Sequence, residues 1–195
     1  MPDSFPPPPD LDLLTRSQVL MALALTAALL LLLAKAWMVL GQASVLPVQF
    51  SGGAIALGGG LGLALAGLSA LAYRLWPPYS ASADAYLDLL LRPLTWTDLF
   101  WLGLLPALSE ELLFRGVMLP ALGLTWWGIL ASSLCFGLLH LLSLRHWPYA
   151  LWAATVGLVL GVSAWLSGNL LVPAIAHAAI NWLSSGVWKL RHRTP

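Results

Sequence analysis

Long apolar stretches, separated by short polar or Gly- and Pro-containing breaks, run through most of the chain. Each stretch is close to the length of about 20 residues that a helix needs to cross a bilayer. The stretches cover residues 19–40, 54–76, 99–122, 126–142, 148–166 and 170–190. The pattern predicts an all-α fold, a polytopic transmembrane helix bundle with about six spans.

The amino-acid composition also indicates a membrane environment. The chain is 59% hydrophobic and only 9% charged, whereas soluble domains carry about 25% charged residues. The few basic residues are too scattered to form a phosphate-binding footprint, so nucleic acid is excluded as an expected partner. The sequence therefore predicts an integral, multi-pass membrane protein whose constant partner is the lipid bilayer.

The basic residues predict the orientation of the spans. With six spans both termini lie on one side of the membrane, and the three loops expected on the opposite side contain no Lys or Arg. Basic residues gather on the cytoplasmic side of membrane proteins. Both termini are therefore expected to be cytoplasmic, because their side would hold Arg16, Arg74, Arg92, Arg145, Lys189, Arg191 and Arg193.

Three charged residues interrupt the third apolar stretch: Glu110, Glu111 and Arg115. Each charge near the bilayer centre costs roughly 2.5–3.5 kcal/mol. Glu111 and Arg115 are spaced i,i+4, so they share a helix face and can pair. Glu110 is rotated by about 100° from Glu111. Spacing alone leaves two readings open, in which Glu110 is a general base or braces helices through hydrogen bonds.

Polar groups at helical spacing also occur in the fourth and sixth stretches. The fourth contains Phe136 one turn before His140, and the sixth contains His177 one turn before Asn181. His177 and Asn181 must project from one helix face. Together with Glu110 and His140 they would form a set that activates water and stabilises an oxyanion, provided that the three helices meet.

The three motifs Glu-Glu-x-x-x-Arg, Phe-x-x-x-His and His-x-x-x-Asn, in this order on successive apolar segments, resemble the signature of CPBP intramembrane proteases. That family includes type II CAAX prenyl endopeptidases and bacteriocin-processing or immunity-related membrane proteins. The resemblance covers residues 94–188, about half of the chain. It implies a hydrolase that performs intramembrane proteolysis in a conical or open cavity between the C-terminal helices.

The resemblance also implies a role for each matching residue. Glu110 and His140 would deprotonate the attacking water, and His177 and Asn181 would stabilise the oxyanion of the tetrahedral intermediate. The supporting residues would be Glu111 and Arg115, which hold the geometry of the site, and Phe136, which packs beside His140.

The expected cofactor is none, in keeping with a glutamate-type endopeptidase. A metallo-type enzyme is the alternative, with zinc on Glu110, His140 and His177, although the sequence contains no HExxH motif. The expected partner is a protein or peptide substrate, with lipidation of that substrate left open. Oligomeric state is not fixed by the sequence.

The domain organisation follows from these assignments. Residues 1–17 are predicted to be a disordered, Pro-rich cytoplasmic leader and residues 18–93 an N-terminal transmembrane helix pair with its cytoplasmic connection. Residues 94–190 would form the CPBP-like catalytic helix bundle, and residues 191–195 a basic cytoplasmic tail.

Two other functions compete with proteolysis. A non-catalytic membrane binding or immunity-type protein would use the same cavity to hold a peptide or a lipid tail. A small transporter would use Glu110 and the histidines as a relay, but inverted repeats with matching broken helices are typical of transporters. The polar groups here fall in the second half of the chain, which ranks the transporter last.

The depths predicted for Glu110 and His140 in the membrane conflict with a site that both residues share. Glu110 lies about 17–20 Å from the cytoplasmic end of its stretch at 1.5 Å per residue, whereas His140 lies within a turn or two of that face. Either a later start of the third helix or a fourth helix that runs past Leu142 would remove the conflict. Pro106 favours the later start, because proline suits the first turn of a helix. The sequence thus predicts a break near Pro106, with residues 100–105 as a separate piece.

Overall fold

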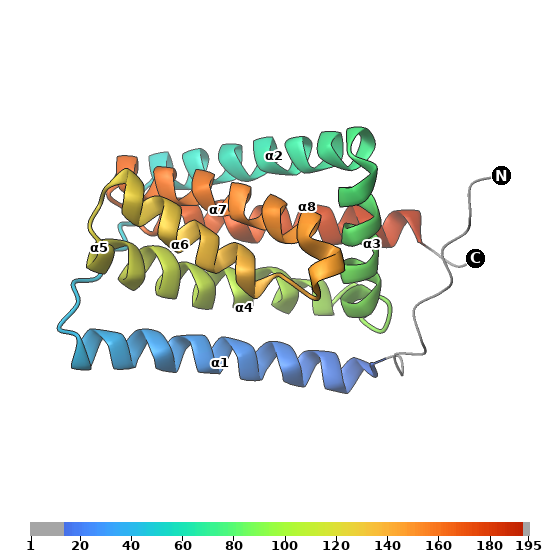
Figure 1. Ribbon diagram of the computed structural model, residues 1–195, viewed down its shortest axis with the longest axis horizontal. Coiled ribbons are helices and arrows are strands. Elements are labelled where there is room, and N and C mark those ends of the chain that lie inside the picture. Colours follow the sequence, from blue (N-terminus) through green and yellow to red (C-terminus); the bar gives the residue numbers. More distant parts are fainter. Residues whose placement is uncertain (1–13, 193–195) are drawn as a thin grey trace.

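The computed structural model describes residues 14–192, and this part of the chain is helical without any strand. Figure 1 shows the long helices side by side in one bundle. The all-α expectation is confirmed. In chain order the elements are α1 (Arg16–Leu40), α2 (Gly52–Leu75), α3 (Pro77–Leu91), α4 (Asp98–Glu111), the π-helix η1 (Leu112–Met118), α5 (Leu119–Leu122), α6 (Trp126–Leu139), the 3₁₀-helix η2 (Leu144–His146), α7 (Trp147–Ser167) and α8 (Leu171–Arg191).

Three helical segments in the described residues are long and apolar enough to cross a membrane: α1, α2 and the segment 144–167 that joins η2 to α7. Helix α6 is apolar but shorter. Each of the six predicted apolar stretches contains a helix, whereas the number of membrane crossings stays a prediction. Residues 1–13 of the predicted leader and 193–195 of the predicted tail lie outside the described part, and α1 begins at Arg16.

Side-chain caps fix where the helices begin. The hydroxyl of Thr15 accepts from the backbone N–H of Gln18, and the Gln18 side chain accepts from the backbone of Thr15, which makes a capping box at the start of α1. Ser51 caps α2 in the simpler way, through the backbone N–H of Ala54. The polar breaks of the sequence therefore act as helix-start signals.

Glycines let the helices approach closely. A Cβ added to Gly62 on α2 would lie 2.6 Å from the Cβ of Ala179, and one added to Gly58 would lie 2.7 Å from the carbonyl oxygen of Val172. Between α6 and α7, a Cβ on Gly137 would lie 2.6 Å from that of Ala154. Small residues at helix contacts are the usual basis of packing inside membranes.

The predicted break near Pro106 is wrong. Helix α4 runs without interruption from Asp98 to Glu111 with Pro106 inside it, because a helix inside a bundle tolerates the one hydrogen bond that proline removes. The irregularity lies further on, in the π-helix η1. There the carbonyl of Gly116 accepts a hydrogen bond of 2.9 Å from the backbone N–H of Leu46 in the α1–α2 connection.

The shortness of α6 explains how Glu110 and His140 can lie at a similar depth in the bundle. This helix has 14 residues and ends at Leu139, which corresponds to a length of about 21 Å, so His140 follows the end of a helix that stops partway along the bundle. Neither a later start of the third helix nor an extended fourth one is needed. Helix α6 packs along α7, and Figure 1 shows the two side by side.

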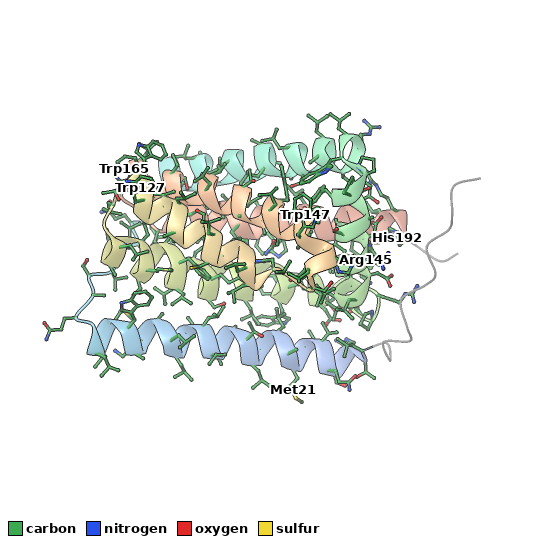
Figure 2. All side chains as sticks on the ribbon, in the orientation of Figure 1. Met21, Trp127, Arg145, Trp147, Trp165 and His192 are labelled. Atoms are coloured by element: carbon green, nitrogen blue, oxygen red, sulfur yellow. The ribbon has the colours of Figure 1, made fainter. Side chains whose placement is uncertain are left out.

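The connection between the second and third apolar stretches forms α3, which stands across one end of the bundle (Figure 1). Its Tyr79 stacks on Tyr149 of α7, with ring centroids 6.3 Å apart. Figure 2 shows Arg145 and His192 at this end, and Trp127 and Trp165 at the opposite one. The end of the bundle where α3 lies therefore carries aromatic rings and basic side chains.

The glycine contacts predict a selective loss of stability. Gly62→Val should lower the free energy of unfolding by about 1–3 kcal/mol, because the added atoms overpack the α2–α8 contact. Gly59→Val is the matched control, since a Cβ at Gly59 meets nothing within 4 Å. Thermal unfolding in detergent measures both variants. Equal melting temperatures for the two would contradict this packing.

Candidate active site

Glu110 and His140 face each other across a short gap. The Oε2 atom of Glu110 lies 3.9 Å from Nε2 of His140, and the two side chains are only 12% and 15% exposed. The Oε2 atom is buried and has no hydrogen-bond partner among residues 14–192. Helix α4 and the end of α6 thus bring together the two residues that the sequence assigned to water activation.

Backbone contact orients the imidazole of His140. Its Nδ1 lies 2.9 Å from the carbonyl oxygen of Phe136, one turn earlier. A carbonyl only accepts hydrogen bonds, so Nδ1 carries the proton and Nε2 of the neutral ring is an acceptor. The carboxylate oxygen and the ring nitrogen that face each other are then both acceptors, which suits a donor held between them.

Glu111, Arg115 and His177 form a second group of polar side chains, and all three are buried. The Oε1 atom of Glu111 accepts from Nη1 of Arg115 and from Nδ1 of His177, each at 2.8 Å. Glu111 and Arg115 are fully buried and His177 is 4% exposed. Arg115 also donates from Nη2 to the carbonyl oxygen of Gly157 at 2.9 Å. Two of the three charges of the third apolar stretch, those of Glu111 and Arg115, are therefore paired inside the protein.

Phe136 links the two groups. Its ring lies 4.7 Å from that of His140 and 5.6 Å from that of His177, the latter edge-on. The guanidinium carbon of Arg115 lies 4.4 Å from the centroid of the same ring. Phe136 is 2% exposed, so it fixes the separation of the two histidines.

A cavity of about 280 Å³ opens beside these residues. Glu110, His140, His177 and Asn181 all line it. The structure therefore brings the four predicted site residues to one cavity from three helices, although Asn181 makes no side-chain hydrogen bond to the other three within the described part. Helix α1 also lines the cavity, through Val19, Ala22, Leu23 and Thr26.

Sequence reasoning missed the aromatic wall of this cavity. Tyr86 of α3 and Tyr149 of α7 stack with ring centroids 4.4 Å apart, and their rings lie 6.2 and 6.3 Å from that of His140. Burial, with a smaller contribution from the charge of Glu110, raises the pKa of Tyr86 above its usual value, so its phenol stays protonated. Two tyrosines 63 residues apart give no motif by which sequence could have found them.

Within residues 14–192, no group of three or more His, Cys, Asp or Glu side chains is arranged to hold a metal ion. Of the three residues in the zinc alternative, His177 directs Nδ1 to Glu111, which leaves Nε2 as its ring nitrogen for a ligand. The facing carboxylate of Glu110 and imidazole of His140 also suit acid–base chemistry.

Breaking the buried pair should be far more damaging than breaking an exposed one. Arg115→Met leaves Glu111 charged and buried, which should lower the free energy of unfolding by about 3–5 kcal/mol. The matched control is Arg92→Met, which removes an exposed i,i+4 pair with Asp88 at 3.2 Å that is worth about 0–1 kcal/mol. Urea or thermal unfolding in detergent measures the difference. A loss under 1 kcal/mol at Arg115 would contradict the role given to this pair.

Comparison with known proteins identifies the segment that carries the site. Residues 92–183 match the family described as Rce1-like, type II CAAX prenyl endopeptidase Rce1-like. The uncharacterized protein YpbD of Bacillus subtilis (strain 168) is 37% identical over 83 residues, which are 43% of this chain and 41% of that protein. The chain thus spans less than half of that relative's length. No solved structure matches significantly.

The matched segment contains all seven predicted site residues and excludes α1, α2 and α3. The family resemblance indicated by the three motifs is confirmed. Together with the apolar helices, the match identifies an integral membrane protein. Residues 92–183, slightly less than half of the chain, are therefore similar to the Rce1-like family of type II CAAX prenyl endopeptidases.

Proposed function

We propose that this protein is an intramembrane endopeptidase that hydrolyses a peptide bond of a membrane-associated protein or peptide. The observation that carries the proposal is the pair of acceptors at 3.9 Å, Oε2 of Glu110 and Nε2 of His140, at the wall of a cavity. The match to a family of prenyl endopeptidases supports the same class of reaction.

Water activation follows from the two acceptors. A water that enters the cavity can donate one hydrogen to Glu110 and the other to His140, since 3.9 Å is too long for a direct hydrogen bond. As its oxygen forms a bond to the carbonyl carbon of the substrate, one proton passes to this pair. The same pair then gives that proton to the departing amine as the C–N bond breaks, which leaves a carboxylic acid and an amine, and the acid loses its own proton to water.

The negative charge of the tetrahedral intermediate needs donors on the opposite side. With Nδ1 donating to Glu111, His177 can donate to an oxyanion from Nε2 when its ring is protonated. Asn181, one turn later on α8, would add an amide donor from the same helix face. In this account Glu111 is a positioning residue, because it fixes the ring of His177 without touching substrate.

The account predicts loss of activity on removing the water-activating group. Glu110→Gln should lower kcat/KM by about a hundredfold or more, because the amide can no longer accept the proton. His140→Ala should give a loss of the same order. The substrates are internally quenched peptides ending in CAAX-type sequences, each prepared with and without a farnesyl group on the cysteine.

Asp88→Asn is the matched control, since this carboxylate is partly exposed and pairs with Arg92 outside the cavity. Its activity should equal that of the unaltered protein. Turnover by Glu110→Gln at the rate of the unaltered protein would contradict the mechanism. Cleavage of no peptide by the unaltered protein would favour a non-catalytic binding protein.

We further propose that both termini are cytoplasmic. Support comes from the basic side chains at the end of the bundle where α3 lies, such as Arg145 (Figure 2). A fluorescent protein fused to the C-terminus should therefore fluoresce in bacterial cells, whereas alkaline phosphatase fused there should be inactive. The reverse pair of results would overturn this orientation.

A further inference from the structure

Helices α2 and α8 are close at one end and separate toward the other. Near the start of both helices, Gly58 and Gly62 of α2 leave no room for a side chain against α8. Toward their C-terminal ends, where α3 lies across the bundle (Figure 1), a cleft of about 100 Å³ opens between α2, α3 and α8. None of the four residues proposed to touch substrate lines this cleft.

The walls of the cleft are mainly apolar. Helix α2 contributes the small residues Ala66 and Ala70, and α8 contributes Leu183 and Val187, which are 38% and 44% exposed. Leu87 of α3 completes the lining on a third side. A trough of this kind, open at the surface of a membrane protein, can accept a hydrocarbon chain but offers few partners to a peptide backbone.

Two basic side chains stand at the end of the trough. The guanidinium carbon of Arg191 lies 5.4 Å from the ring centroid of Tyr73, and Arg191 has no carboxylate within ion-pair distance among residues 14–192. On the facing helix α3, Asp84 accepts a hydrogen bond from the Tyr73 hydroxyl at 2.8 Å. Arg191 is therefore held in place by a ring rather than by a counter-ion.

His192 lies beside Arg191 and also lines the cleft. Its ring stacks on that of Trp188 with centroids 4.3 Å apart, and its Nδ1 bonds the Trp188 carbonyl oxygen at 3.0 Å. Figure 2 shows His192 at the end of the bundle where α3 lies. Because Nδ1 donates to this carbonyl, Nε2 can donate to an anion when the ring is protonated.

We propose that this cleft binds one anionic phospholipid, with its phosphate on Arg191 and on the protonated ring of His192 and an acyl chain along the trough between Ala70 and Val187. Basic pockets between transmembrane helices at the cytoplasmic side are the usual sites for anionic headgroups. The charge selects an anionic headgroup, and the apolar trough selects a lipid rather than free phosphate. The site lies outside residues 92–183 except for Leu183, so the family match does not assign it.

The test is native mass spectrometry of the delipidated full chain, titrated with phosphatidylglycerol or with phosphatidylcholine of the same acyl chains. The unaltered protein should retain one phosphatidylglycerol in preference to phosphatidylcholine. Arg191→Gln should reduce that preference about fivefold, because one basic residue near the headgroup contributes about that factor. Arg74→Gln is the matched control, an exposed arginine at the same end of α2 that does not line the cleft.

A second variant separates the trough from surface charge. Ala70→Trp fills the trough and keeps both basic residues, so it should reduce binding of both lipids. Equal binding of the two lipids by the unaltered protein, or an undiminished preference in Arg191→Gln, would overturn the proposal. Unchanged binding in Ala70→Trp would do the same, since it would indicate adsorption to the surface. The assay contains no peptide, so its outcome is independent of the proposed peptidase activity.

Discussion

The carboxylate of Glu111 is the interaction on which the rest of the site depends. It is fully buried, and one of its oxygens accepts from both Arg115 and His177. A charge in an apolar interior is tolerated only when it is paired and hydrogen-bonded. This requirement ties the π-helix to α8 and, through the contact of Arg115 with Gly157, to α7. The pairing therefore sets the position of His177 before any substrate arrives.

The length of helix α6 is the second constraint on the site. Because α6 ends at Leu139, the residue that follows it, His140, lies at the cavity. The chain then reaches α7 through residues 141–146, and His140 and Phe136 at this end of α6 line the cavity. Phe136 holds this end of α6 through contacts with His140, His177 and Arg115. A short helix thus places His140 at the cavity, and the ring of Phe136 contacts both histidines.

The sequence predicted the helical class, the pairing of Glu111 with Arg115 and the family, because these depend on hydropathy and on i,i+4 spacing. It did not predict the bond from Glu111 to His177, since that bond joins residues 66 positions apart. The error at Pro106 has a different origin. Proline usually breaks a helix, but packing in the bundle keeps α4 continuous through Pro106. The irregular hydrogen bonding lies further along the chain, in the π-helix η1. The tyrosine wall was also beyond reach, because α3 and α7 meet only in the folded protein.

The central claim is that Glu110 and His140 act as one unit on a single water. A double-mutant cycle on kcat/KM tests this most directly, with Glu110→Gln, His140→Ala and the protein carrying both changes. Residues that act as a unit have strongly non-additive effects. The account predicts that the double variant is hardly worse than either single variant. Losses that multiply, each change exerting its full effect in the presence of the other, would contradict it.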